Sequence, residues 1–171
     1  MRPIPFIVAL FFAASPATAQ SWKEYAYPTD FFSVAFPADP KVETMTYQAA
    51  DGRPVEARVY SVSQDSGVFR MTVADLSDPA MQESAVLDHA VRTLSQGSEI
   101  KVDIPHRISR VYGRQLSIAA PDGGYSSVAV FYHKQRLYQI EGTVLPGAAT
   151  ATSDAIRFQQ SLAFTDDSTN R

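Results

Sequence analysis

Hydrophobic and polar residues alternate with a period of two along the stretch from Gly124 to Leu145. Its first half alternates Val128, Val130 and Tyr132 with Ala129, Phe131 and His133. Its second half alternates Tyr138, Ile140 and Val144 with Leu137, Gln139, Glu141 and Thr143. A strand with one buried face has this pattern. We therefore predict a long β-hairpin that turns at Lys134-Gln135, with Ile140 facing the core and Glu141 facing away from it.

Similar alternation predicts strands elsewhere, over residues 31–36, 42–48, 55–63, 68–76 and 99–110, and in a further strand marked by Leu116, Ile118 and Ala120. Asp51-Gly52 is a hairpin-turn signal between the second and third of these strands. In the fourth, Phe69, Met71 and Val73 share one face. Pro105 cannot donate a backbone hydrogen bond, so it belongs at a sheet edge or a bulge.

The period changes to that of a helix after Asp78-Pro79. Asp78 fits an N-cap and Pro79 the first helical turn. Gly97 fits the position just after the helix. The apolar positions of this helix are Ala80, Ser84, Leu87, Ala90, Val91 and Leu94. A last helix is predicted after Pro146-Gly147, capped by Thr152 or Ser153, with Ala155, Phe158 and Leu162 on one face.

The order of these elements predicts an α+β fold. Most connections between strands are too short for a parallel crossover, so we expect a largely antiparallel sheet flanked by helices, an α/β/α sandwich. Residues 20–165 form one predicted domain and residues 166–171 a polar C-terminal tail. The aromatic residues Trp22, Tyr25 and Tyr27 lie close together near the start of this domain. They form either an arm for a partner or a cluster packed against the sheet edge, and packing is favoured because large aromatic side chains are mostly buried.

Residues 1–19 read as a signal peptide. Arg2 precedes an apolar run, and Ala17-Thr18-Ala19 fits the small-residue cleavage rule, with Gln20 as the new N-terminus. The run is about half the ~20 residues of a spanning helix, and no later stretch is longer. We therefore expect a periplasmic or secreted protein with no membrane span after cleavage. The chain contains no cysteine, which excludes disulfides, thiolate metal sites and a lipid-modified cysteine.

Charge and motifs exclude several classes of function. The net charge is -3, and it becomes -4 when Arg2 is removed with the leader, without any run of Lys or Arg that would mark a nucleic-acid binder. The histidines His89, His106 and His133 lack the spacing of a metal site, so they fit local hydrogen bonding better than a long-range zinc site. Ser126-Ser127 lies outside any nucleophile motif and is predicted to lie on the polar strand face.

Two further sets of charged residues leave alternatives open. Glu56 and Glu141 could form an acid/base pair across a cleft, although a solvent-facing row on the sheet is favoured. Arg107, Arg110 and Arg114 could bind an anionic group, although their spacing divides them between the two faces of a strand. No catalytic, cofactor-binding or metal-binding residue is assigned, and no cofactor is expected.

Several segments together resemble a known family: W-x-x-Y near the mature start, FFSVAFPADPKVE, LDHAVRTL, GRQLSI, SSVAVFYHKQRLYQIEG and FQQSLAF. From Trp22 to Phe164 the chain resembles exported bacterial domains of uncharacterised role in the Mog/PsbP superfamily. The resemblance implies a central antiparallel sheet between helices. Superfamily members act as accessory or binding proteins, and the resemblance carries no catalytic motif onto these residues. Fold alone does not determine function.

Three functional hypotheses follow. The first is an exported, monomeric, non-enzymatic accessory or binding protein whose partner is an envelope or extracellular protein or a small ligand. The second is a small-molecule or lipid carrier that uses a groove between the sheet and a helix. The third is a hydrolase built from residues that converge only in the fold.

Overall fold

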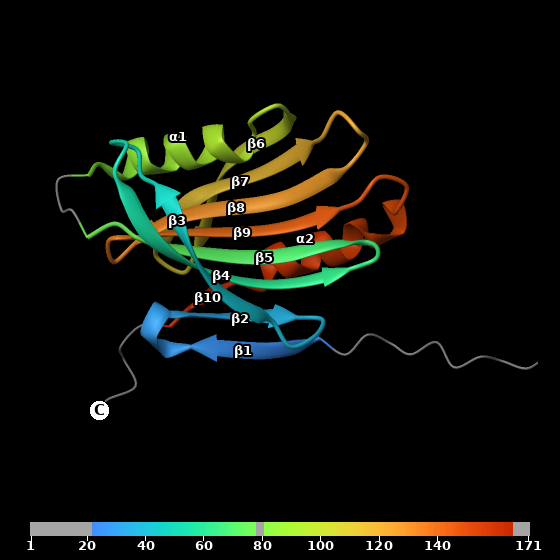
Figure 1. The fold of residues 1–171 in the computed structure, drawn as a ribbon, viewed down its shortest axis with the longest axis horizontal. Helices are drawn as coiled ribbons and strands as arrows, with labels where there is room; N and C mark the ends of the chain where they lie inside the picture. The colour runs from blue at the N-terminus through green and yellow to red at the C-terminus, as the bar shows by residue number, and fades with distance from the viewer. Residues whose placement is uncertain (1–21, 78–80, 166–171) are drawn as a thin grey trace, which may run out of the picture.

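The computed structural model describes residues 22–77 and 81–165 and consists mainly of antiparallel strands (Figure 1). The predicted leader, the Asp78-Pro79 helix start and the 166–171 tail lie outside the described residues. The elements in chain order are β1 (Lys23–Tyr27), η1 (Pro28–Asp30), β2 (Phe32–Phe36), β3 (Lys41–Gln48), β4 (Pro54–Gln64), β5 (Gly67–Asp75), α1 (Glu83–Leu94), β6 (Glu99–Ile108), β7 (Val111–Ala119), β8 (Tyr125–His133), β9 (Arg136–Val144), η2 (Ala149–Ala151), α2 (Thr152–Gln160) and β10 (Ala163–Phe164).

The strands form two sheets. The larger has seven strands in the order β3-β4-β5-β9-β8-β7-β6, and the smaller has three in the order β1-β2-β10. Every strand pair is antiparallel. The predicted hairpin is confirmed as β8 and β9, whose two turn residues Lys134 and Gln135 both have positive φ, 47° and 59°. Positive φ at both positions is the geometry of a type I′ turn, whose twist suits a two-residue hairpin.

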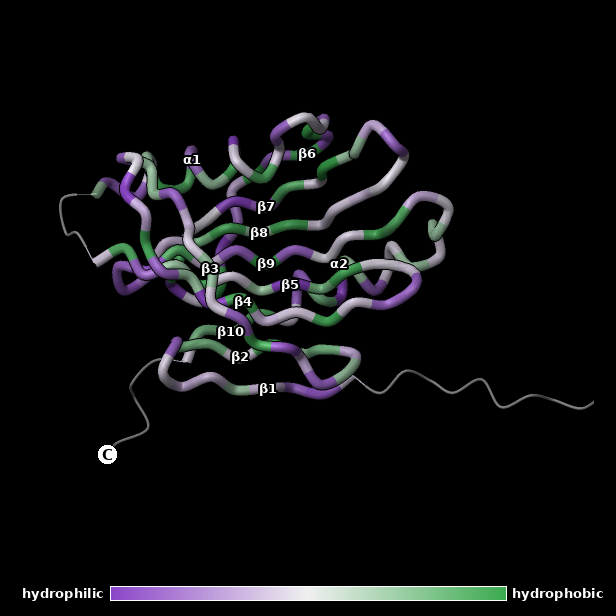
Figure 2. The backbone as a smooth tube through the Cα atoms, viewed as in Figure 1, coloured by the Kyte–Doolittle hydropathy of each residue, from purple (hydrophilic) through white to green (hydrophobic). Residues whose placement is uncertain are grey.

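Each face of the large sheet has its own hydrophobic cluster. On one face α1 packs on β8 and β9, and its buried Leu87 and Ala90 cluster with Val130 and Leu137. On the other face α2 and the small sheet pack together, and Phe158 joins a cluster that contains the fully buried Ile140. The predicted face of Ile140 is thus confirmed. Hydrophobic residues are concentrated within strands such as β2 and β8 (Figure 2).

The predicted α/β/α sandwich is only partly right. A sheet with α1 on one face and α2 on the other is present, but a second, three-stranded sheet, which was not predicted, lies beside α2. The aromatic residues near the start belong to it: Tyr25 and Tyr27 lie in β1, and with Trp22 they pack against the α2-side cluster. Packing of these side chains is therefore confirmed, although they join a separate sheet and not the edge of the large one.

Both helices begin differently from the prediction. α1 begins at Glu83 after Gln82, and Ser84 is exposed, because Val86 and Leu87 turn the buried face away from it. Thr152 is the first residue of α2 and not its cap, because the N-cap position is Ala151. The Thr152 hydroxyl donates a hydrogen bond to the Ala149 carbonyl at 2.9 Å. Ala155, Phe158 and Leu162 are buried as predicted. Within the described residues, no helix is long and apolar enough to cross a membrane.

Candidate functional site

The three histidines lie on three separate elements. His89 on α1 has its Nε2 2.9 Å from the Gln48 carbonyl oxygen, a contact between the helix and the end of β3. His106 on β6 packs beside the Phe131 ring, and burial lowers its pKa. His133 at the end of β8 packs beside Phe164. Residues 22–77 and 81–165 contain no group of three or more His, Cys, Asp or Glu side chains that could hold a metal ion.

The paired serines lie on opposite faces of β8, because neighbouring residues of a strand alternate. Ser127 is buried on the side of α2, so its predicted place on the polar face is wrong. Ser126 lies on the α1 side, where its hydroxyl contacts the Thr143 hydroxyl at 2.9 Å and Glu141 Oε1 at 3.4 Å. Glu141 lines a cavity to which Glu56 does not contribute. The suggested pair of Glu56 and Glu141 therefore does not share that site.

The three arginines do not form an anion site together. Arg114 on β7 donates to Asp103 on β6 and, at 2.6 Å, to Asp88 on α1. These carboxylates raise the pKa of Arg114, with the Asp103 hydrogen bond the largest cause. Arg107 stacks over Tyr112, and Arg110 lies in the turn after β6. Arg114 thus fastens α1 to the sheet edge.

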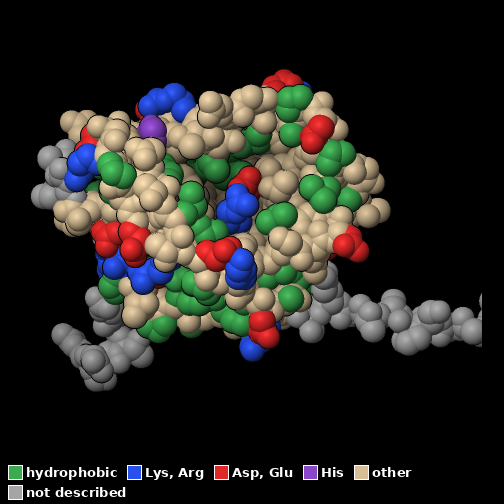
Figure 3. Space-filling view, viewed as in Figure 1, with side chains coloured by type: hydrophobic (Ala, Val, Ile, Leu, Met, Phe, Trp, Pro, Cys, Tyr) green, Lys and Arg blue, Asp and Glu red, His purple; other side chains and the backbone are tan. Residues whose placement is uncertain are grey.

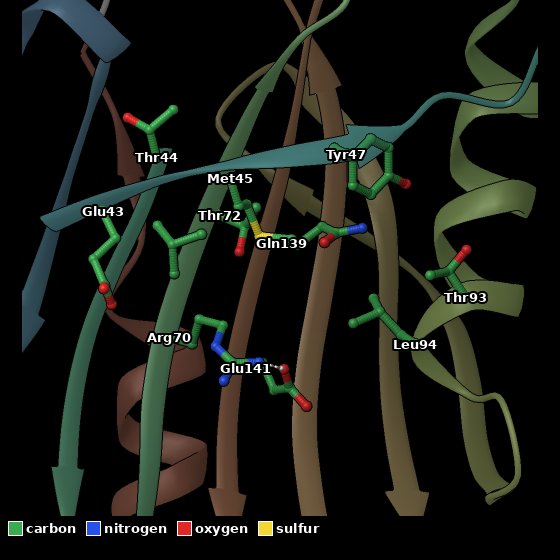
Figure 4. Close-up of a pocket in the computed structure, with 11 residues that line it drawn as sticks. Glu43, Thr44, Met45, Tyr47, Arg70, Thr72, Thr93, Leu94, Gln139 and Glu141 are labelled. Atoms are coloured by element: carbon green, nitrogen blue, oxygen red, sulfur yellow. Dashed lines mark ion pairs between the residues drawn. The ribbon is translucent and has the colours of Figure 1, made fainter. Parts of the chain in front are cut away.

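The main candidate site is a cavity of about 460 Å³ on the α1 face of the large sheet. Its floor comes from β4, β5 and β9, one wall from β3 and the other from the C-terminal end of α1. β3 pairs with β4 and crosses in front of the central strands (Figure 4). The space-filling view shows this face hollowed, with hydrophobic and charged side chains in the hollow (Figure 3). α1 packs on β8 and on part of β9, and the cavity lies beside the C-terminal end of α1, over β4, β5 and the residues Gln139 and Glu141 of β9.

The inner part of the cavity is apolar but contains unsatisfied polar atoms. Met45, Val59 and Leu94 supply aliphatic surface. Tyr47 and Gln139 are each 7% exposed, and Tyr47 Oη and Gln139 Nε2 are buried without a hydrogen-bond partner. Burial raises the pKa of Tyr47, and the nearby Gln139 amide partly offsets this, although the two side chains do not reach good hydrogen-bond geometry. A buried polar atom without a partner costs about 1–3 kcal/mol.

The outer part of the cavity is charged. Arg70 on β5 lies opposite Glu141 on β9, with Arg70 Nη1 3.8 Å from Glu141 Oε2 (Figure 4). Glu43 on β3 completes this rim, and its Oε1 is 2.7 Å from Lys41 Nζ. The cavity therefore changes from apolar inside to charged at its mouth, which suits an amphipathic ligand.

Two inner residues of the site, Thr72 and Gln139, were not predicted from the sequence. Gln139 lies between Tyr138 and Ile140, so the alternation assigned it to a solvent-facing row. Both side chains are in fact more than nine-tenths buried. Their burial depends on β3 crossing the sheet, a long-range arrangement that the strand pattern does not encode. The available signal was an uncharged polar residue, Gln139, between the aromatic Tyr138 and the aliphatic Ile140.

A second polar cluster, also missed, surrounds Asp30 in η1, which is fully buried. Its carboxylate accepts hydrogen bonds from Arg58 and Tyr60 on β4 and from Arg136 on β9. Its backbone carbonyl accepts one from Tyr138 Oη at 3.0 Å. These bonds join the small sheet to the large one and occupy the carboxylate. We therefore assign this cluster a structural role.

No family model matches the chain, and no curated protein matches its sequence. Among solved structures, the chain is similar to cyanobacterial PsbP (CyanoP) of Synechocystis, with a TM-score of 0.58 and 11% identity over 90% of this chain and 98% of that one. It also matches PA94, a protein of unknown function from Pseudomonas aeruginosa, with a TM-score of 0.40 and 12% identity over 78% of this chain and 90% of that one. Because the second TM-score is only 0.40, the first similarity alone bears on the structure, and at 11% identity it bears on the fold and nothing more. The chain has a PsbP-like fold, as its segments implied.

Proposed function

We propose that this protein is a non-enzymatic binding protein, working after export, whose cavity on the α1 face holds a small amphipathic molecule. This joins the binding-protein hypothesis to the carrier hypothesis. The observation that carries the proposal is the inner part of the cavity, where Gln139 Nε2 and Tyr47 Oη are buried without partners beside apolar side chains. Buried polar atoms normally have partners, and because these two residues line the cavity, a ligand or ordered water there would complete their hydrogen bonds.

The chemistry of the lining supports binding over hydrolysis. The side chains around the cavity, all within the described residues, include no His, Ser or Lys. Its hydroxyls belong to threonines and Tyr47, and a hydroxyl needs an adjacent base to act as a nucleophile. Glu141, the nearest candidate base, already accepts hydrogen bonds from Thr143 and Ser126 and pairs with Arg70. The volume lies within the range of roughly 300–1,000 Å³ typical of small-molecule sites.

Native mass spectrometry of protein purified gently from its own cell envelope tests the proposal. We expect a retained small molecule whose mass is lost on denaturation. The variant Leu94→Trp should fill the cavity and lose the molecule, because Leu94 lines it at the end of α1. Ile104→Trp is the matched control, since Ile104 is exposed on the edge strand β6. A protein without any retained molecule, and equal behaviour of both variants toward added ligands, would contradict the proposal.

A further inference from the structure

The charged mouth of the cavity has one fixed and one loosely held partner. Glu141 is fixed, because its Oε1 accepts hydrogen bonds from Thr143 at 3.2 Å and Ser126 at 3.4 Å. Arg70 is loose, because its 3.8 Å contact with Glu141 exceeds hydrogen-bond length and its side chain is 50% exposed. The guanidinium therefore retains donors for a ligand beside a carboxylate that is held in position.

Three charged side chains line the mouth of the cavity. Arg70 lies beside Glu141, and Glu43 pairs with Lys41, which lies outside the lining. A ligand with a single negative charge would meet repulsion from the two carboxylates, and one with a single positive charge would meet repulsion from Arg70. A neutral head group would leave both kinds of charge unused. A head group with a positive and a negative charge close together matches both.

The apolar interior adds a requirement for the rest of the ligand. Tyr47, Val59 and Leu94 line the space beyond the charged rim, and the volume of about 460 Å³ leaves room for a bulky side chain. We infer that the ligand is a free α-amino acid with a large apolar side chain. Its carboxylate binds Arg70, its ammonium group binds Glu141, and its side chain enters the interior. This inference rests on the proposed function of the cavity.

Calorimetric titration with four matched probes tests the inference. L-phenylalanine carries both charges, N-acetyl-L-phenylalanine only the negative one, L-phenylalaninamide only the positive one, and N-acetyl-L-phenylalaninamide neither. We expect L-phenylalanine to bind about tenfold or more tightly than each of the others, because only it satisfies both partners at the mouth. Arg70→Met should abolish the preference for the free carboxylate, and Glu141→Gln should abolish the preference for the free ammonium group.

The controls separate this inference from the function on which it rests. Arg110→Met removes an arginine in the β6–β7 turn and should leave all four affinities unchanged. If the uncharged probe binds as tightly as L-phenylalanine, the zwitterion inference is wrong and the cavity proposal stands. If no probe binds while a different molecule is retained in native mass spectrometry, the zwitterion inference is again wrong and the cavity proposal again stands. If no probe binds and nothing is retained, both proposals are wrong.

Discussion

The two faces of the seven-stranded sheet differ in what surrounds their buried polar groups. Each face has an unpartnered amide, since Gln159 on α2 is fully buried with both Nε2 and Oε1 lacking a hydrogen-bond partner. On the α2 side, the buried Asp30 is surrounded by donors from β4 and β9 and lies within an aromatic cluster of Phe32, Tyr60 and Tyr138. On the α1 side, Gln139 and Tyr47 are buried without partners beside a cavity. One face is closed by two layers, α2 and the small sheet, while α1 covers the other only in part. We expect the closed face to stabilise the fold, and the proposed binding site lies on the open one.

The largest expected effect is on the closed face. Asp30→Ala should lower the free energy of unfolding by about 3–5 kcal/mol, because it leaves Arg58 and Arg136 without their carboxylate in a buried site. Urea unfolding measures this. Asp39→Ala is the control, since Asp39 also accepts a hydrogen bond from a tyrosine, Tyr25, but is 89% exposed. If the two variants unfold at the same urea concentration, the Asp30 cluster does not hold the sheets together.

Ile140→Ala should cost about 2–5 kcal/mol, since Ile140 is fully buried beneath α2. Its neighbour Glu141 lies on the other face with its carboxylate at the cavity mouth, so Glu141→Ala should cost only about 0.5–1.5 kcal/mol through lost hydrogen bonds. Comparing how far each substitution lowers the urea midpoint tests which face of the sheet each residue occupies. A larger loss for Glu141→Ala would indicate that the faces are assigned the wrong way round.

Gly142→Ala tests the close packing of α2 on β9. A methyl group there would lie 2.6 Å from the Ala155 carbonyl oxygen and 2.7 Å from its Cα, so the helix must shift. Overpacking of this kind costs about 1–3 kcal/mol. Thermal unfolding should detect the loss, and Gly124→Ala is the milder comparison because its nearest neighbour would be a side-chain oxygen at 3.1 Å. Equal melting temperatures for the two variants would show that α2 can shift away from β9 with little loss of stability.

The closed face should also make the protein sensitive to alkaline pH. Burial raises the pKa of Tyr138 from 10.0 to about 12, and burial next to Asp30 raises that of Tyr60. Because the folded state holds these protons more tightly, their stabilising effect is complete below pH 10 and is lost as the pH rises toward 12. Tyr138→Phe should flatten the fall in stability over this range, and the exposed Tyr112→Phe should not. A curve unchanged by Tyr138→Phe would contradict this assignment.

Much of the fold could be predicted from local pattern, and the sites could not. The hairpin of β8 and β9 followed from alternation and a short polar turn, and the edge position of Pro105 followed from its missing donor. The small sheet was missed because β1 is short and its pairing with β2 runs through η1. The Asp30 cluster joins residues 28 to 108 positions apart in sequence. The cavity depends on where β3 crosses the sheet, which no single strand encodes.

The smallest expected change in stability belongs to Gln139→Leu, and it tests the comparison most directly. Replacing an amide whose Nε2 has no partner by an apolar side chain of similar size should leave the free energy of unfolding unchanged or raise it, because no hydrogen bond donated by that nitrogen is lost. Ligand retention, measured by native mass spectrometry on the same preparation, should fall about tenfold or more. A variant that loses about 2 kcal/mol or more of stability while retaining its ligand would show that Gln139 supports the fold and that the open face is not a binding site.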